Sequence, residues 1–138
     1  MPSGRKTVIN LMYTANLVGE RTTELLKPFG ITVQQFNVLR ILRGQKGKPA
    51  NLFTIQERMI HKMSNTTRLV DKLIEKKLVD RMVCPNNRRK VEISITDSGL
   101  KLLSEIDGPI DELNLTLVEA FTPEELETFN IFLERIRS

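Results

Sequence analysis

The sequence predicts a mainly helical domain with one small β-hairpin. Apolar residues recur at three- and four-residue spacing through most of the 138 residues, which is typical of amphipathic helices. One segment, residues 83–96 (VCPNNRRKVEISIT), instead combines alternating apolar residues with a PNN turn, which is typical of two antiparallel strands. The length predicts one domain with a core of its own.

The first two helices are predicted from their apolar stripes and the residues that end them. Residues 8–26 form the first stripe, and Pro28 and Gly30 end that helix. A second, short helix follows Thr32 and ends at Gly44. Both carry enough apolar residues on one face to pack against a core.

Two further helices are predicted in quick succession. Thr54 is expected to cap the first, which buries Ile55 and Met59 and ends near His61. Ser64 is expected to cap the second, because a serine hydroxyl can accept hydrogen bonds from N–H groups of the first helical turn. One face of this helix is apolar, with Leu69, Val70, Leu73 and Ile74.

The hairpin is predicted from turn chemistry and alternation. An extended segment begins at Val79, and residues 85–87 suit a turn, since proline presets its first corner and asparagine tolerates left-handed backbone. Val91, Ile93 and Ile95 then alternate with polar residues, which predicts a strand with one buried face.

The remaining sequence predicts a long helix and a final shorter one. The long helix begins at residues 96–97 and runs to about residue 120, with a bend at residues 108–109. The final helix begins in TPEE, where Thr122 is the cap, Pro123 the first helical residue and Glu125 the partner in a capping box.

The charge distribution indicates where a polyanion would bind. The net charge is +4, yet residues 58–90 hold ten bases and three acids, whereas residues 97–138 hold ten acids and three bases. A localised basic surface in the middle of the chain favours a polyanionic partner. The alternative is a solvated basic face without a partner.

Other patterns argue against membranes and catalysis. No apolar run approaches the roughly 20 residues needed to span a bilayer, and residues 1–17 lack a secretory signal. The single cysteine favours a reducing compartment, so we expect a cytoplasmic protein. His61 is the only histidine and has no partners at metal-ligand spacing. We therefore expect no enzyme activity, no cofactor and no metal.

Two short helices followed directly by a hairpin have the layout of a winged helix-turn-helix. The second helix of such a pair can enter the major groove of duplex DNA, where its first residues reach base edges. A basic hairpin beside it can neutralise phosphate or lie along the minor groove. The sequence therefore predicts a DNA-binding wing.

Three segments resemble the multiple antibiotic resistance regulator (MarR) family of bacterial transcription factors. RLVDKLIEKKLVDR (68–81) resembles the family's recognition helix and wing entry. Arg81, the NRR of residues 87–89 and the TDSG of residues 96–99 keep the spacing of its wing signature. TPEELETFNIFLERI is similar to its last dimerisation helix. Asn87 replaces the usual aspartate, which implies a softer wing.

The resemblance implies a mainly α fold with a small β-hairpin, a winged helix-turn-helix whose N- and C-terminal helices form a dimerisation domain. Residues 1–33 and 97–138 would be the dimerisation helices and residues 34–96 the DNA-binding region. A two-fold homodimer would bind a near-palindromic operator in double-stranded DNA. The alternative is that the outer helices pack on each other within one chain.

The expected DNA contacts lie on the recognition helix, before it and on the wing. Arg68 suits base edges, Lys72 suits phosphate, and the wing arginines suit phosphate or the minor-groove floor. Thr66 is expected to face the core, and Asp71 to pair with Arg68 or Lys72. The bland alternatives are helix capping for Ser64 and a solvated turn for the arginines. The full set is Lys62, Ser64, Asn65, Thr67, Arg68, Lys72, Arg88 and Arg89.

The resemblance also implies a small lipophilic or aromatic effector bound between the outer helices and the winged region. The residues expected to line its crevice are Met12, Tyr13, Phe36 and Arg40, although apolar residues at such spacing also suit a plain core. Cys84 is interpreted as an ordinary strand cysteine, with an oxidisable thiol as the alternative.

The predicted function is therefore a homodimeric, sequence-specific DNA-binding transcriptional regulator of the repressor type, relieved by an effector. Two alternatives stay open at this point. One is a winged-helix module that docks an acidic protein. The other is a sequence-independent architectural DNA binder, which the acidic C-terminal third disfavours.

Overall fold

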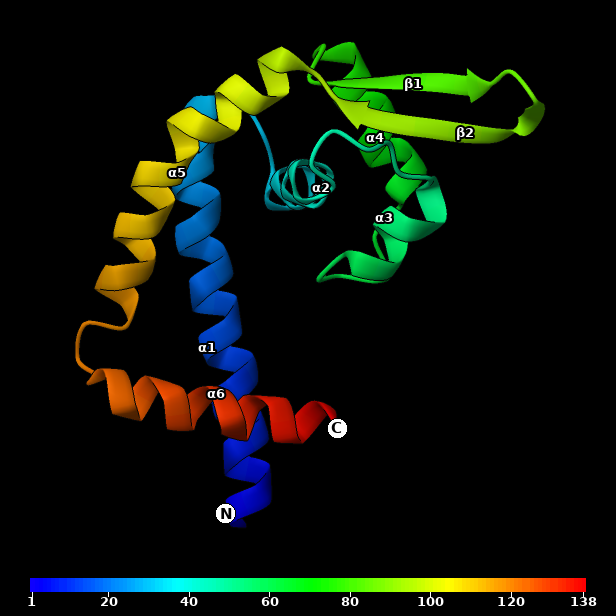
Figure 1. The fold of residues 1–138 in the computed structure, drawn as a ribbon. Helices are drawn as coiled ribbons and strands as arrows, with labels where there is room; N and C mark the ends of the chain where they lie inside the picture. Colours follow the sequence, from blue (N-terminus) through cyan, green and yellow to red (C-terminus); the bar gives the residue numbers. More distant parts are fainter.

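The computed structural model describes the backbone of residues 1–138 and every side chain except those of residues 88 and 89. The predicted class, mainly helical with one hairpin, is confirmed (Figure 1). The elements in chain order are α1 Ser3–Leu26, η1 Lys27–Phe29, α2 Val33–Gly44, α3 Leu52–Arg58, α4 Thr66–Glu75, β1 Val79–Cys84, β2 Asn87–Ile95, α5 Asp97–Leu117 and α6 Pro123–Arg137.

Helices α2, α3 and α4 together with the hairpin form what we call the winged unit. The core lies among these elements. Leu39, Ile55, Leu73 and Ile93 are completely buried there. The end of α1 and the first half of α5 also reach this core, through the buried residues Leu26, Leu103 and Ile106. From the winged unit α1 and α5 extend side by side, and α6 follows a turn at the far end of α5 (Figure 1).

The predicted helix cap is confirmed in α6 but not in α3 and α4. Thr32 and Thr122 each form a complete capping box, as the TPEE pattern indicates for α6. The caps of α3 and α4 are Asn51 and Asn65, whose side-chain oxygens accept from the N–H groups three residues later at 2.7 and 3.1 Å.

The predictions of Thr54 and Ser64 as caps are therefore wrong. Thr54 lies inside α3 and supplies the backbone N–H that Asn51 caps. Ser64 comes one residue before the cap of α4. Asparagine and serine are about equally good caps, so the residue types alone do not distinguish Ser64 from Asn65.

The hairpin has an antiparallel register from Val79 opposite Ile95 to Val83 opposite Val91, with an irregularity at Cys84 near the tip. Ala50, in the loop after α2, forms two backbone hydrogen bonds with Ile93, at 2.9 and 2.7 Å. The base of the hairpin is therefore held to the loop between α2 and α3, whereas its tip extends away from the helices (Figure 1).

Helix α4 ends in a Schellman motif. The N–H of Leu78 donates to the Leu73 carbonyl at 3.0 Å, and the N–H of Lys77 donates to the Ile74 carbonyl at 2.9 Å. Lys77 has a φ of 63°, the left-handed conformation that this motif requires and that usually selects glycine. The motif turns the chain sharply from α4 into β1.

The start of α5 packs directly on this motif. Thr96 caps α5 and also donates its hydroxyl to the Lys77 carbonyl at 2.8 Å, while its N–H donates to the Leu78 carbonyl at 3.0 Å. Gly99 lies so close that a Cβ there would be 2.4 Å from the Leu78 carbonyl oxygen. The end of the recognition helix and the beginning of α5 therefore form one packed unit.

Candidate nucleic-acid interface

The recognition helix has a buried face and a polar exposed face. Thr66 is buried, as predicted, and its hydroxyl donates to the Gln56 side-chain oxygen on α3. Val70 and Leu73 continue this buried face into the core. The predicted DNA-contacting residues Asn65, Thr67, Arg68 and Lys72 are all exposed, so the structure gathers them on the surface of α4 and its cap.

The turn that leads into α4 is held by two hydrogen bonds from side chains to backbone carbonyls. The Gln56 amide donates to the Lys62 carbonyl, and the Lys62 ammonium donates to the Glu57 carbonyl at the end of α3. The side chain of Lys62 is exposed near the start of α4, and the side chain of Ser64 is half-buried. Lys62 therefore has a more accessible side chain than Ser64.

Asp71 pairs with Arg81, not with Arg68 or Lys72 as predicted. The carboxylate of Asp71 lies 3.2 Å from the guanidinium of Arg81 on β1. Because β1 runs past α4, an arginine ten residues later in the sequence reaches Asp71 better than its helical neighbours. Lys72 instead lies 3.8 Å from Glu75.

This pairing has a consequence for the exposed face. Among the described side chains Arg68 forms no ion pair, so its guanidinium projects from the first turn of α4 without a carboxylate to neutralise it. The pair of Asp71 with Arg81 also links the recognition helix to the wing. The negative charge of Asp71 is thereby compensated within the basic surface.

Lys76 is a positioning residue that the sequence did not indicate. Its ammonium, at the C-terminal end of α4, donates to the Gly30 carbonyl at 2.5 Å and to the Gln35 side-chain oxygen at 3.1 Å. Gln35 is also the capping-box residue of α2. Lys76 therefore ties the recognition helix to the junction of α1 and α2, a contact 41 to 46 residues away in the sequence that no local pattern could predict.

The wing carries the remaining predicted contacts. Arg88 and Arg89 belong to β2, but their side chains lie outside the described residues, so their DNA contacts stay predictions. Asn87 lies opposite Cys84 at the tip. The thiol of Cys84 is free and half-buried, and the softer wing expected from Asn87 also stays a prediction.

A crevice of about 1100 Å³ opens between α1, α2 and α5. Three of the four predicted effector-binding residues line it, namely Met12, Phe36 and Arg40, and the Arg40 guanidinium lies 5.5 Å from the centre of the Phe36 ring. Tyr13 does not line the crevice. It follows Met12 by one residue, and one helical residue turns a side chain by about 100°, so it is exposed on another side of α1.

Two other kinds of feature, a metal site and a membrane-spanning helix, are not found among the described residues. No group of three or more histidine, cysteine, aspartate or glutamate residues among them is placed to hold a metal ion. None of the helices in the described part of the chain is both long enough and apolar enough to cross a membrane.

The arrangement of α3, α4 and the hairpin defines a winged helix-turn-helix protein. Residues 31–91 match the model of the MarR family. The chain carries the MarR family domain, and the resemblance predicted from the recognition helix and wing is confirmed. The predicted class, a transcription factor rather than an enzyme, is confirmed with it.

Similar proteins span nearly the whole chain. The uncharacterized HTH-type transcriptional regulator YsmB of Bacillus subtilis is 27% identical over 128 residues, which cover 93% of this chain and 86% of YsmB. The MarR transcription factor of Planctomyces limnophilus is 28% identical, with 97% of each chain covered and a TM-score of 0.76. A mutant of Escherichia coli MarR solved with operator DNA shares the fold, at 24% identity, a TM-score of 0.78, and 94% and 95% coverage.

Proposed function

We propose that this chain is a sequence-specific DNA-binding transcriptional regulator that acts as a homodimeric repressor in a bacterial cytoplasm. The observation that carries the proposal is the exposed polar face of α4, in which Arg68 has no ion-pair partner among the described side chains. The operator complex of the Escherichia coli MarR mutant, which shares the fold, supports DNA as the partner.

We assign the DNA contacts by the chemistry and position of each residue. Asn65, Thr67 and Arg68 lie on the cap and first turn of α4, where the N-terminal part of a recognition helix meets base edges. Lys72 lies one turn later and suits a phosphate. Lys62 and Ser64, before the helix, and the wing residues Arg88 and Arg89 complete the proposed interface.

The exposed apolar side chains of the outer helices support a homodimer. Helix α6 contributes no buried residue, although it carries Phe129, Phe132 and Ile136. In α1, Val8, Ile9 and Leu17 are at least 40% exposed. Packing of these helices on each other within one chain would have covered these faces, so we favour a second copy of the chain as their cover.

In the proposed dimer, different parts of the chain would have different functions. Residues 1–33 and 97–138 would form the dimerisation domain, and residues 34–96 would bind DNA. Two-fold symmetry would present two copies of α4 to half-sites about one helical turn, roughly 34–36 Å, apart. The operator would therefore be near-palindromic.

The crevice supports regulation by a small lipophilic or aromatic effector. Its wall combines the apolar side chains of Met12 and Phe36 with the cation of Arg40, which suits an aromatic ring bearing an acidic group. Such a ligand regulates DNA binding only if it binds one arrangement of the dimer better than the other. Relief of repression is the expected outcome.

The test compares three alanine variants on an operator and on a scrambled duplex. Arg68→Ala is expected to reduce the preference for the operator by about tenfold, because one good base contact contributes ~1–3 kcal/mol of discrimination. Lys72→Ala is expected to weaken binding to both duplexes and to lower the salt slope by about one. Arg5→Ala, at the far end of α1, is the matched control and should change neither.

The same comparison separates the alternatives. Equal affinity of the unmodified chain for both duplexes would favour an architectural DNA binder. Absence of binding to either at low salt would favour a protein-docking module. Sedimentation of the chain as a monomer at micromolar concentration would contradict the homodimer independently of any DNA result.

A further inference from the structure

Met63 is the most exposed large apolar side chain in the part of the chain that the structure describes. Its exposed fraction is 98%, compared with 80% for Met1 at the start of the chain. The residue lies between α3 and α4, two positions before Asn65, the cap of α4. Exposure of a single apolar side chain does not by itself indicate a partner, so the surroundings of Met63 decide what it meets.

The chemistry of the turn does not account for a methionine at this position. The N–H of Ser64 donates to the His61 carbonyl at 3.1 Å, which closes a β-turn with Lys62 and Met63 at its two corners. Such corners usually hold glycine, proline, asparagine, aspartate or serine, because these residues suit the backbone of a turn. Met63 contributes neither turn chemistry nor burial, whereas a contact outside this chain would account for it.

The turn is held in a fixed position beside α4. The side-chain amide of Gln56, on α3, donates to the Lys62 carbonyl, and its oxygen accepts from the hydroxyl of Thr66 in the first turn of α4. The Lys62 ammonium in turn donates to the Glu57 carbonyl. One side chain therefore ties the corner next to Met63 to the first turn of α4, so Met63 projects from a defined place at the start of the recognition helix.

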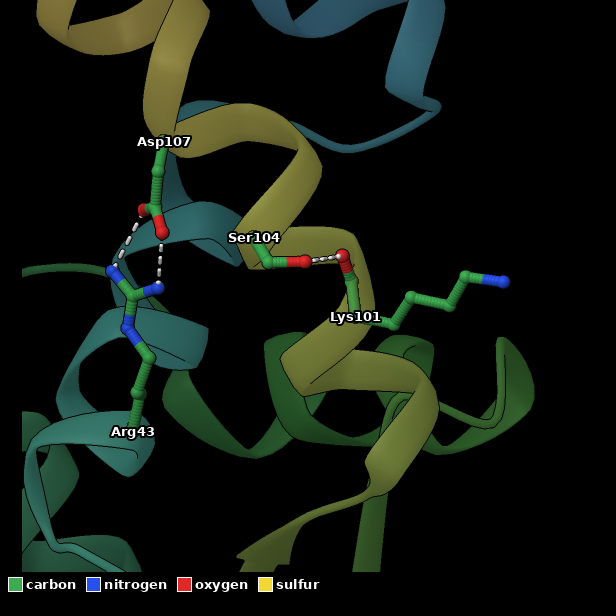
Figure 2. Close-up of polar contacts among 4 residues, drawn as sticks. All are labelled: Arg43, Lys101, Ser104 and Asp107. Atoms are coloured by element: carbon green, nitrogen blue, oxygen red, sulfur yellow. Dashed lines mark hydrogen bonds and ion pairs between the residues drawn. The ribbon is translucent and has the colours of Figure 1, made fainter.

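The segment that holds Met63 is basic and contains no carboxylate. Residues 58–68 include three Lys or Arg and no Asp or Glu. Elsewhere in the winged unit a base is neutralised by a carboxylate, as where Arg43 donates to both oxygens of Asp107 at 2.9 and 3.0 Å (Figure 2). Among the described side chains, none of the three bases of residues 58–68 forms an ion pair. A polyanion therefore complements the surface around Met63.

Within duplex DNA, one group suits the Met63 side chain better than the others. A thioether donates no hydrogen bond and accepts only weakly, so it suits neither phosphate nor the polar atoms of the base edges. The C5-methyl of thymine is an apolar group that lies beside these atoms in the major groove. Residues at the start of a recognition helix reach this groove, and the three rotatable bonds of methionine let its end adapt to a methyl group.

We propose that Met63 is a base-reading residue whose side chain covers the C5-methyl of one thymine in the operator half-site. Met63 then adds a preference for thymine next to the bases met by Asn65 and Thr67. This assignment rests on the proposed function, because it requires operator DNA.

The test replaces thymine by deoxyuridine, which removes the C5-methyl and leaves every hydrogen-bonding group of the base pair in place. An operator duplex is first selected from random-sequence DNA with the unmodified chain. Each thymine of one half-site is then replaced singly, and affinities are measured by fluorescence anisotropy at one fixed salt concentration. For the unmodified chain we expect one thymine whose replacement weakens binding about fourfold, the factor that corresponds to ~0.8 kcal/mol per buried carbon.

Substitutions of exposed methionines separate Met63 from other sources of such a methyl effect. Met63→Ala should bind the thymine and deoxyuridine duplexes equally at this position and keep the ratios found at all other positions. Met63→Leu, which keeps a large apolar side chain, should keep a preference for thymine. Met82→Ala is the matched control, since Met82 lies on β1 and is 68% exposed, and it should keep the full fourfold ratio.

Two results would overturn the proposal and leave the proposed function intact. One is an operator that binds tightly although no single thymine replacement weakens binding. The other is a fourfold effect that persists in Met63→Ala, because the thymine methyl would then contact a different residue. If selection yields no preferred duplex, the proposed function is wrong, and the assignment of Met63 is wrong with it.

Discussion

Replacement of Gly99 by alanine tests whether the start of α5 is packed against the end of the recognition helix. A Cβ at this position would lie 2.4 Å from the Leu78 carbonyl oxygen and 2.6 Å from Cγ1 of Ile95. The carbonyl belongs to the backbone and cannot rotate away, and Leu78 is itself held by the Schellman motif. Alanine must therefore push α5 away from the joint between α4 and the wing.

The magnitude follows from the cost of overpacking and from a control glycine in another helix. Forcing an extra carbon into a packed site costs about 1–3 kcal/mol. At Gly19, inside α1, nothing lies within 4 Å of a built Cβ, so alanine there should stabilise the helix by roughly 0.5–1 kcal/mol. The two substitutions, identical in chemistry, should differ in free energy of unfolding by about 1.5–4 kcal/mol and in sign.

Urea denaturation followed by circular dichroism measures both free energies of unfolding at one fixed protomer concentration, because dimerisation makes stability concentration-dependent. The expected order of stability is Gly19→Ala, then the unmodified chain, then Gly99→Ala. If Gly99→Ala unfolds at the same urea concentration as the unmodified chain, the close packing of α5 on Leu78 is wrong.

Four further substitutions test local features of the structure. Lys77→Gly should raise the unfolding free energy by about 1 kcal/mol in the same urea assay, because glycine adopts the left-handed conformation without strain; no gain would contradict the φ of 63°. Asn65→Ala should cost ~1 kcal/mol and Ser64→Ala much less, and the reverse order would restore serine as the cap. Asp71→Asn should change stability by at most about 1 kcal/mol, since its pair with Arg81 is half-exposed. It should nevertheless weaken DNA binding measured by fluorescence anisotropy, because the pair links α4 to the wing. Unchanged affinity would show that this pair does not position the wing.

Features set by local chemistry could be predicted from the sequence. Thr122, Pro123 and Glu125 start α6 as expected, because a capping box involves only residues within one turn. The alternation at Val91, Ile93 and Ile95 likewise gave the strand. The helical periods and the wing spacing were enough to define the class of fold.

Features set by contacts distant in sequence could not be predicted. The partner of Asp71 is Arg81 because β1 folds back beside α4, and Lys76 reaches Gly30 because the α1–α2 junction lies near the end of α4. Helical spacing alone favoured nearer partners for Asp71. The orientation of α1 about its axis, which turns Tyr13 away from the crevice, also depends on contacts distant in sequence.

The most direct test of the central claim is fluorescence anisotropy of the purified chain with DNA upstream of its own gene and with a scrambled duplex, across a salt series. Site-specific regulation predicts tight binding to the upstream DNA, at least about 10³-fold weaker binding to the scrambled duplex, and an affinity that falls steeply as salt rises. Equal affinity for both duplexes, or no binding to either at low salt, would contradict it.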